Sequence, residues 1–261
     1  MFTAVLGDAA NDQLAGCRFA DVRWVGETGS TNADLLTLAG DGAPEGIVLG
    51  ADHQTAGRGR AGRTWVAPAG ASLLVSMLLR PPPARAALCS MAVGLAAADA
   101  IDAVAGFRPR LKWPNDVVWP GDGTADDRKL AGILAEAHWP APDEVAVVVG
   151  IGLNVNWPRQ LPDELVGIAT AVNHVAGRDV DRAAVLVAML RSLDRRYDEL
   201  VAGVLLDSVR TASATLGRRV RVDLGTEVIE GIAGEITDDG HLVVDGRAVT
   251  VGDVVHLRPA D

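Results

Sequence analysis

Short apolar runs separated by polar or glycine-containing segments predict a β-sheet over most of the chain. The runs with strand character are Arg18–Glu27, Gly46–Ala51, Ser72–Leu79, Asp116–Trp119, Leu130–Ala137 and Glu144–Ile151. Two longer stretches, Arg85–Val104 and Asp181–Val201, are typical of helices, and Leu205–Leu216 is predicted to continue the second helical region. This mixture predicts an α+β fold of layered α/β type, with a central sheet covered by helices.

The pattern changes after Leu216. The later segments are short and alternate between apolar and polar residues, and the turn-forming pairs Asp239-Gly240 and Asp245-Gly246 lie between them. These segments are Arg219–Val222, Glu227–Ile236, His241–Val244 and Val254–Leu257. They are typical of a small β-barrel, so we expect one domain over residues 1–215 and a second over residues 216–261.

The composition is that of a globular protein. Of the 261 residues 49% are hydrophobic, and the formal net charge of -10 argues against broad nonspecific DNA binding. We expect no membrane segment, because no apolar run reaches the roughly 20 residues that span a bilayer. We also expect no secretory signal, because the N-terminus lacks a basic stretch followed by a hydrophobic core. Cys17 and Cys89 are expected to be free buried thiols, which fits a cytoplasmic protein.

The most distinctive segment is a loop rich in glycine and arginine, Gln54–Trp65, between two predicted strands. Glycine lets a backbone approach a ligand closely, and arginine supplies a permanent charge and a planar set of donors. Solvated turns and disordered RNA-binding tails share this composition, but the flanking strands anchor this loop at both ends. No Gly-Lys-Ser/Thr ending marks it as a Walker A loop. We expect it to close over an anionic small molecule.

Two further segments place polar groups at the start of a helix or strand. Ser30-Thr31-Asn32 precedes a helical run, which is typical of a plain N-cap and equally of a helix start that binds a polar ligand head. In Lys112–Asp116 a proline disfavours helix, and Asn115 and Asp116 then offer polar and anionic groups to a nucleotide or Mg²⁺. A plain turn has this composition too.

Lysine is scarce in this chain. Lys112 and Lys129 are the only lysines among 24 basic residues, so a lysine here indicates a position that needs a compact point charge, unless chance explains it. Lys129 begins an apolar strand, and we expect its ammonium group to project from the strand edge toward a ligand. Gly150 and Gly152 allow close backbone approach near the end of the next strand.

In combination these segments resemble the biotin–protein ligase family. The family's Gly-Arg-Gly-Arg-x-Gly-Arg-x-Trp loop matches residues 57–65 without a gap, and its Lys-Trp-Pro-Asn-Asp block matches residues 112–116. Its Arg-Lys-Leu-x-Gly-Ile-Leu block matches residues 128–134, and Gly-Ile-Gly-x-Asn matches residues 150–154. The resemblance implies a class II synthetase-like catalytic domain with a mixed central sheet, followed by a small C-terminal SH3-like β-barrel.

The resemblance also implies a reaction in two steps. Biotin and ATP first give biotinyl-5′-AMP and pyrophosphate, and biotin then passes to one lysine of a biotin carboxyl carrier domain of an acyl-CoA carboxylase. A carboxylate that attacks a triphosphate brings negative charges together, so the reaction requires cationic donors and Mg²⁺ near the α-phosphate.

By similarity, the site residues divide among three tasks. The biotin-binding residues would be Ser30, Thr31, Asn32, Gln54, Gly57, Arg58, Gly59, Arg60, Lys129 and Gly132. The residues that bind ATP and its phosphates would be Arg58, Arg60, Arg63, Trp65, Asn115, Asp116, Lys129 and Asn154. Lys129, Arg58 and Arg60 would be catalytic, and Asp116 would be a ligand of Mg²⁺.

Two loops are expected to adapt to the ligand. Residues 55–69 would be disordered without ligand and ordered over biotinyl-AMP, which would protect the water-sensitive anhydride. Residues 154–165 interrupt the strand pattern and form the second loop. Trp65 or Trp157 would stack on adenine, although either could pack in the core or lid.

Partners and rival functions complete the sequence hypothesis. Some family members carry an N-terminal helix-turn-helix domain, but the catalytic pattern here begins by about residue 18, so we expect no DNA-binding repression. The protein would be a monomer or a ligand-dependent homodimer. The nearest rival is a lipoate–protein ligase, which shares the fold and the adenylation chemistry. A noncatalytic RNA-binding module is disfavoured by the acidic net charge.

Overall fold

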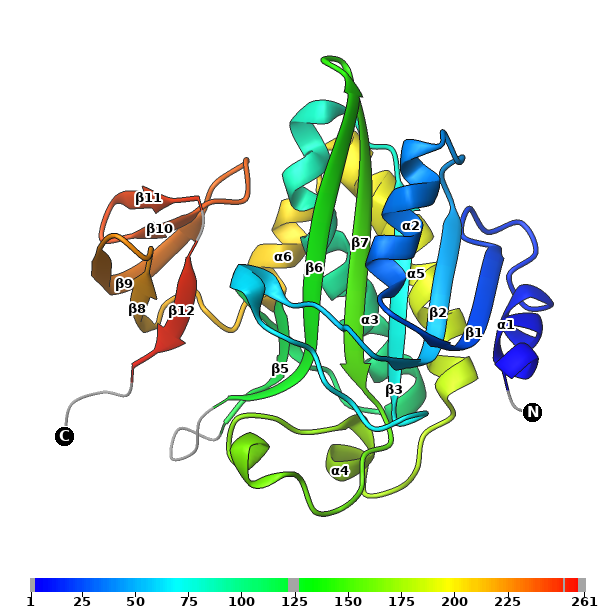
Figure 1. Ribbon diagram of the computed structural model, residues 1–261. Coiled ribbons are helices and arrows are strands. Elements are labelled where there is room, and N and C mark those ends of the chain that lie inside the picture. Colours follow the sequence, from blue (N-terminus) through cyan, green and yellow to red (C-terminus); the bar gives the residue numbers. More distant parts are fainter. Residues whose placement is uncertain (1–2, 122–126, 251, 258–261) are drawn as a thin grey trace.

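A seven-stranded mixed sheet forms the centre of the molecule (Figure 1). The computed structural model describes residues 3–121, 127–250 and 252–257. The strand order is β1-β2-β3-β7-β6-β5-β4, with β1 and β2 parallel and the other neighbours antiparallel. The strands are β1 (Asp21–Thr28), β2 (Ile47–Gln54), β3 (Ser72–Leu79), β4 (Arg110–Lys112), β5 (Asp116–Trp119), β6 (Arg128–Ala141) and β7 (Glu144–Asn154). The predicted mixed central sheet is confirmed.

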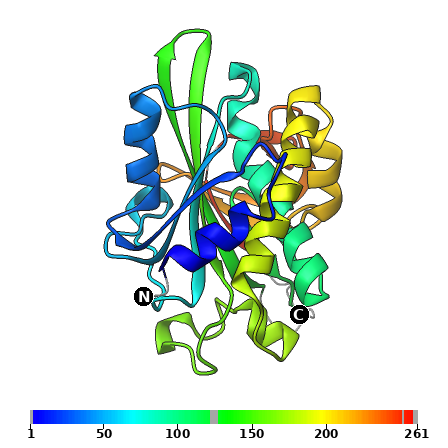
Figure 2. The same ribbon diagram turned by 90° about the vertical axis from the view of Figure 1, so that its right-hand side faces the viewer.

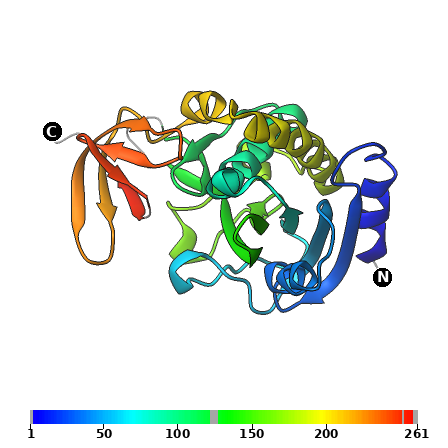
Figure 3. The ribbon, with the colours of Figure 1, turned by 90° about the horizontal axis from the view of Figure 1, so that it is seen from above.

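Helices cover both faces of this sheet (Figures 2 and 3). The helix α2 (Thr31–Gly40) packs on one face, against β2, β3, β6 and β7. On the other face α3 (Cys89–Ala105) packs against the sheet, and α5 (Arg182–Ala202) and α6 (Leu205–Ala212) pack against α3. The remaining helices are α1 (Thr3–Asn11), which lies beside β1, and the short α4 (Val172–Ala176). Single 3₁₀ turns span Arg60–Gly62, Pro83–Leu88 and Asp163–Leu165.

The apolar character of α3 follows from its position between two layers. Most of its residues are buried, because the sheet covers one side and α5 the other. The helical stretch Pro83–Ala105 is long and apolar enough to cross a membrane by length and composition, contrary to the expectation that no run is long enough. Its most apolar window is 67% buried inside the protein, so the core accounts for its composition.

The C-terminal segment forms a separate antiparallel sheet, as its alternating pattern predicted. Its strand order is β11-β10-β9-β8-β12, and Asp223 and Val220 of β8 pair with Asp253 and His256 of β12. The strands are β8 (Arg219–Asp223), β9 (Val228–Ile236), β10 (Leu242–Val244), β11 (Arg247–Val249) and β12 (Asp253–His256). In Figure 1 this unit lies beside β5 and β6, at the end of the large sheet away from β1.

Some predicted boundaries were wrong. The region predicted as helix over Leu205–Leu216 ends at Ala212, because the chain then turns to pair with β4 at Leu111. The strand predicted over Leu130–Ala137 continues to Ala141, since it forms a long hairpin with β7. Helix α1 was not predicted. Both cysteines are free as expected, but Cys17 is only partly buried.

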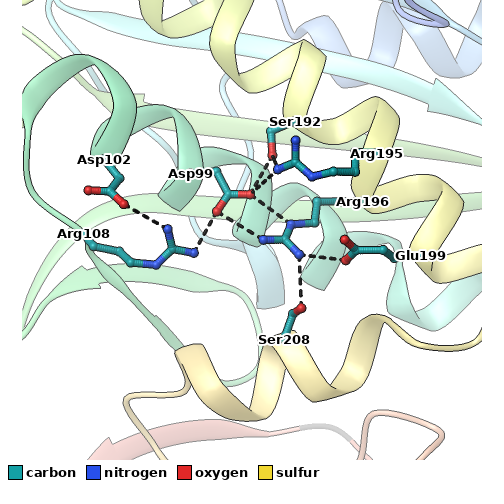
Figure 4. Close-up of polar contacts among 8 residues, drawn as sticks. All are labelled: Asp99, Asp102, Arg108, Ser192, Arg195, Arg196, Glu199 and Ser208. Carbon is teal, nitrogen blue, oxygen red and sulfur yellow. Dashed lines mark hydrogen bonds and ion pairs between the residues drawn. The ribbon is translucent and has the colours of Figure 1, made fainter.

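A network of ion pairs, largely buried at its centre, connects α3 to α5 on the face of the sheet opposite to α2 (Figure 4). Asp99 of α3 accepts hydrogen bonds from Ser192 and Arg196 of α5 at 2.7 and 2.9 Å, and from Arg108 at 2.7 Å. Burial alone would raise the pKa of Asp99, but the bonds from Arg196, Ser192 and Arg108 lower it below its ordinary value. The Asp99 and Arg196 side chains are only 13% and 12% exposed, so their pairing is little screened.

We therefore expect Asp99→Asn to lower the free energy of unfolding by about 2 kcal/mol, because it removes one of the two counter-charges of the largely buried Arg196 guanidinium. A group with a lowered pKa stabilises the fold above its ordinary pKa and loses this effect as the pH falls through the lowered value. The difference between wild type and variant, measured by urea unfolding, should accordingly shrink toward acid pH. The exposed Asp102→Asn is the matched control and should change stability by less than about 0.5 kcal/mol. Equal losses in both variants would contradict the assignment.

Candidate active site

The four distinctive sequence segments meet around one cavity of about 770 Å³ on the face of the sheet that carries α2. The loop of residues 55–69, named the lid below, covers the cavity, and β12 of the C-terminal sheet contributes Asp253, Val254 and Val255 to its wall. All the predicted site residues line it except Gly57. Those that do are Ser30, Thr31, Asn32, Gln54, Arg58, Gly59, Arg60, Arg63, Trp65, Asn115, Asp116, Lys129, Gly132 and Asn154.

Strand register makes the floor of the cavity flat. Gly132 of β6 lies opposite Gly152 of β7, with Asp116 next in this row on one side and Leu74 on the other. Directly opposed residues point to the same face of an antiparallel sheet, so two neighbouring positions on this face lack side chains. The indole of Trp65 occupies the space: a Cβ at Gly152 would lie 2.4 Å from it, and one at Gly132 would lie 2.8 Å from it.

At one end of the cavity a buried polar cluster surrounds the first turn of α2. Gln54 Oε1 accepts hydrogen bonds from the backbone N–H and the hydroxyl of Thr31, at 2.8 and 3.0 Å. The Thr31 hydroxyl lies 2.8 Å from Ser76 Oγ, which donates to Asn32 Oδ1 at 2.6 Å. Ser30 is the N-cap residue, as predicted, yet its side chain makes no capping bond within the described part of the chain. Its hydroxyl therefore remains available at the cavity wall.

The network continues from Asn32 to the lid. Asn32 Nδ2 donates to Glu136 Oε2 at 2.9 Å, and the same oxygen accepts from Arg58 at 2.8 Å. Gly150 makes this arrangement possible, because a Cβ there would lie 2.0 Å from Asn32 Oδ1. Glu136 thus links the polar end of the cavity to the first arginine of the lid.

The other two lid arginines are held by different parts of the protein. Arg60 donates to Asn115 Oδ1 at 3.0 Å, and Arg63 forms an ion pair with Asp253 of β12. Gly57 lies behind the cavity wall, where its carbonyl accepts from the Trp65 N–H at 2.9 Å and closes the base of the lid. A Cβ at Gly57 would lie 2.4 Å from the Trp65 carbonyl oxygen, so this position requires glycine for close packing.

Lys129 stands where the floor meets the Lys112–Asp116 segment. Its Nζ lies 2.7 Å from Asp116 Oδ1 and 5.5 Å from the centre of the Trp65 ring, within the range of a cation–π contact. The loop after β7 fixes its backbone, since the Lys129 N–H donates to Ile168 O at 2.8 Å. The ammonium group therefore lies between a carboxylate and an aromatic face.

Burial changes the charge balance of two cations on the cavity wall. Desolvation lowers the pKa of Arg60, against the opposing effect of Asp116, and Arg63 lowers it further. Desolvation also lowers the pKa of Lys112, which Asp116 and Asp127 partly offset. A poorly solvated cation gains more from an anionic ligand than an exposed one, because water competes less for it.

The two candidate tryptophans differ in their surroundings. Trp157 is buried and donates from Nε1 to Ser72 Oγ at 2.9 Å. In the part of the chain that the structure describes, Trp65 Nε1 is buried without a hydrogen-bond partner. Asn154 also lines the cavity, with its amide donating to Thr170 O at 3.1 Å.

Several site residues were missed by the sequence interpretation. Lys112 lines the cavity, and Ser76 and Glu136 complete the polar network, although none had been assigned a role. Ser76 is a polar residue in the middle of an apolar strand, and Glu136 follows Gly132 at an even spacing on β6. Both signals were visible in the sequence. Among the described residues no three His, Cys, Asp or Glu side chains gather to hold a metal, so Asp116 stands without further protein ligands of that kind.

Comparisons with known proteins agree with this geometry. Residues 29–156 match the model of the biotin/lipoate A/B protein ligase family, and residues 215–257 match the biotin protein ligase C-terminal domain. The biotin–[acetyl-CoA-carboxylase] ligase of Mycobacterium tuberculosis is 43% identical, over 95% of this chain and 94% of its own length. The bifunctional ligase/repressor BirA of Bacillus subtilis is 35% identical, over 83% of this chain and 66% of its own length.

A solved structure gives the same result for the fold. The biotin protein ligase of Aquifex aeolicus, in complex with biotin and ATP, superposes with a TM-score of 0.75 and 27% identity. The match covers 92% of this chain and all of that one. With a 43% identical relative matched over nearly its full length and family models matching both sheets, the chain belongs to the biotin protein ligase family.

Proposed function

We propose that this protein activates biotin with ATP to biotinyl-5′-AMP and transfers biotin to a lysine of a carrier domain of an acyl-CoA carboxylase. One observation carries the proposal: a single cavity joins a buried polar cluster at one end to a group of arginines and a lysine at the other. Such a cavity suits a ligand with a polar head, an apolar body and an anionic end. Biotin joined to a nucleotide phosphate has this form.

The polar cluster would bind the ureido head of biotin. Ser30, Thr31, Asn32 and Gln54 present hydroxyl and amide groups that can both donate and accept, as a ureido carbonyl flanked by two N–H groups requires. Their own hydrogen bonds hold them in place before the ligand arrives, which limits the ordering cost of binding. The Trp65 indole, which lies on the glycine floor, would offer an apolar surface to the body of biotin.

The cationic residues would bring together the biotin carboxylate and the α-phosphate of ATP. A carboxylate oxygen attacks phosphorus, the bond to the β-phosphate oxygen breaks, and pyrophosphate leaves. Arg58, Arg60 and Lys129 would neutralise the negative charge of both reactants from fixed positions. Arg63 would add positive charge from the middle of the lid. Asn115 and Asn154 would make polar contacts with the phosphates.

Asp116 would supply one carboxylate oxygen as a ligand of Mg²⁺. The phosphates of ATP and water would supply the other ligands, as is usual for this ion. Its carboxylate is at the cavity wall and, among the described residues, forms its ion pair with Lys129, at 2.7 Å, which fits a site shared with a phosphate ligand. Bound Mg²⁺ would lower the charge of the triphosphate. Trp65 is the better candidate for a contact with adenine, since Trp157 is fixed by Ser72.

In the second step the ε-amino group of the carrier lysine attacks the carbonyl carbon of the anhydride, an amide bond forms and AMP leaves. The lid would exclude water until the carrier domain arrives. We further propose that residues 1–215 carry both steps and residues 216–261 complete the site, in a cytoplasmic enzyme. We also propose a monomer or ligand-dependent homodimer without DNA-binding repression.

Biotin-dependent exchange of pyrophosphate into ATP tests the proposal most directly. We expect Lys129→Ala and Arg58→Ala to lower the exchange rate about 100-fold, the usual effect of removing one fixed charge donor. The neighbouring Arg128→Ala is the matched control, since this exposed residue lies outside the cavity wall, and should exchange at the wild-type rate. Exchange driven by lipoate and not by biotin would reverse the substrate assignment.

Gly150→Ala tests the polar end of the cavity. The added methyl group would collide with Asn32 Oδ1, at 2.0 Å, and separate Asn32 from Ser76 and Glu136. We expect the KM for biotin to rise at least about tenfold, with a smaller effect on the KM for ATP. Gly234→Ala, in β9 with open space around the position, serves as control. An unchanged KM for biotin would refute the assignment of the head-group site.

The proposed lid motion predicts a change in protease sensitivity. Arg58, Arg60 and Arg63 are trypsin sites, and in the closed lid each contacts a different part of the protein. We expect trypsin to cut residues 55–69 rapidly in the free enzyme and slowly with biotin and ATP, followed by mass spectrometry of the fragments. Equal cutting rates in both states would rule out ligand-dependent closure.

A further inference from the structure

A buried histidine–aspartate pair lies between the C-terminal sheet and the catalytic sheet. The His256 Nδ1 of β12 is 2.8 Å from Oδ2 of Asp127, the residue that precedes β6. Their side chains are 8% and 3% exposed. The pair lies outside the cavity wall, and the reaction above uses neither residue.

The histidine is connected to the active site through one hydroxyl group. His256 Nε2 lies 3.2 Å from Thr215 Oγ1, and this oxygen accepts the backbone N–H of Trp113 at 3.0 Å. Thr215 is fully buried. Trp113 stands in the Lys112–Asp116 segment, two residues before Asn115 and three before Asp116, which hold Arg60 and Lys129.

The hydrogen bonds have a definite direction. The Arg218 guanidinium lies 3.1 Å from His256 Nδ1 and 3.0 Å from Asp127 Oδ2. Because the carboxylate is nearer to Nδ1, at 2.8 Å, and also accepts from Arg218, we assign the ring proton to Nδ1, which donates to Asp127. His256 Nε2 is then an acceptor in the neutral ring. The Thr215 hydroxyl donates to Nε2, and the same oxygen accepts the backbone N–H of Trp113. The imidazole thus donates through Nδ1 and accepts through Nε2.

We propose that His256, oriented by Asp127, is a positioning residue that acts through the Thr215 hydroxyl to hold the Lys112–Asp116 segment at the phosphate end of the active site. The inference rests on the proposed adenylation function. By this inference the C-terminal sheet helps to position the Lys112–Asp116 segment. That sheet carries His256, and through Gly240 O it accepts a second hydrogen bond, at 3.0 Å, from the indole of Trp113.

The surrounding charges favour the neutral ring. Burial lowers the pKa of His256; Asp127 opposes this shift, and the charges of Lys112 and Arg218 reinforce it. Burial raises the pKa of Asp127, but the bonds from His256 and from the Gly121 N–H, with the charge of Arg218, lower it to about 2. Aspartate is therefore ionised and histidine neutral near neutral pH.

The test compares Thr215→Val with Thr215→Ser in the full chain, by biotin-dependent pyrophosphate exchange. Valine keeps the shape and removes the hydroxyl, whereas serine keeps the hydroxyl. We expect Thr215→Val to lower kcat/KM for ATP about tenfold with the KM for biotin unchanged, because a displaced segment misplaces Asn115 and Asp116. Thr215→Ser should retain the wild-type values of both kcat/KM for ATP and the KM for biotin. His241→Gln, a histidine just before β10, is the matched control.

Asp127→Asn provides an independent variant if Thr215→Val does not fold. The asparagine amide removes the negative charge that holds the ring proton on His256 Nδ1. With the amide N–H donating to Nδ1, the proton moves to Nε2 and the Thr215 hydroxyl loses its acceptor in the ring, so the same selective loss for ATP is expected. Wild-type ATP kinetics in the folded Thr215→Val or Asp127→Asn variant would overturn the proposal. So would an equal loss in Thr215→Ser, or a parallel rise in both KM values. A wild-type protein without biotin-dependent exchange would instead overturn the proposed function.

Discussion

Gly132 and Gly152 stand side by side on neighbouring strands, and the sheet face between them carries no side chain. Trp65 reaches down from the lid onto this bare surface, where a Cβ at either position would collide with it. The lid can therefore close only because the sheet beneath it is flat. The cation–π contact of Lys129 depends on where this indole lies, and the backbone of Trp65 closes the base of the lid at Gly57.

A second constraint concerns the arginines of the lid. Their like charges must be held at separate positions around the cavity before an anionic ligand binds. Each lid arginine has its own partner: Glu136 for Arg58, Asn115 for Arg60 and Asp253 for Arg63. These contacts are partly exposed, so each contributes little stability and can be exchanged for a phosphate or carboxylate. Weak partners hold the arginines apart without competing strongly with the ligand.

Much of the fold and site was predictable, because both rest on local signals. The strands from Ser72–Leu79 to Glu144–Ile151 follow their apolar runs, and the motifs supplied most of the cavity wall but not its residues from 162–169 or from β12. What could not be predicted depends on register and on distant contacts. Glu136 contacts Asn32 only because β6, β7 and β3 pair as they do, and α1 is held by packing rather than by its own pattern. The extended end of β6 likewise follows from its hairpin partner.

The C-terminal sheet shows why a division into domains from sequence is incomplete. Its alternating strands indicate an independent unit, yet Asp253, Val254 and Val255 form part of the cavity wall and Arg63 pairs with Asp253 across 190 positions of the chain. This unit binds the Trp113 indole directly at Gly240 O and reaches the Trp113 backbone N–H through His256 and Thr215. The C-terminal sheet thus contacts Arg63 of the lid through Asp253 and Trp113 of the Lys112–Asp116 segment through Gly240. These contacts fix the distance between the lid and that segment. The end of the cavity that we propose for the phosphates is therefore built from both sheets.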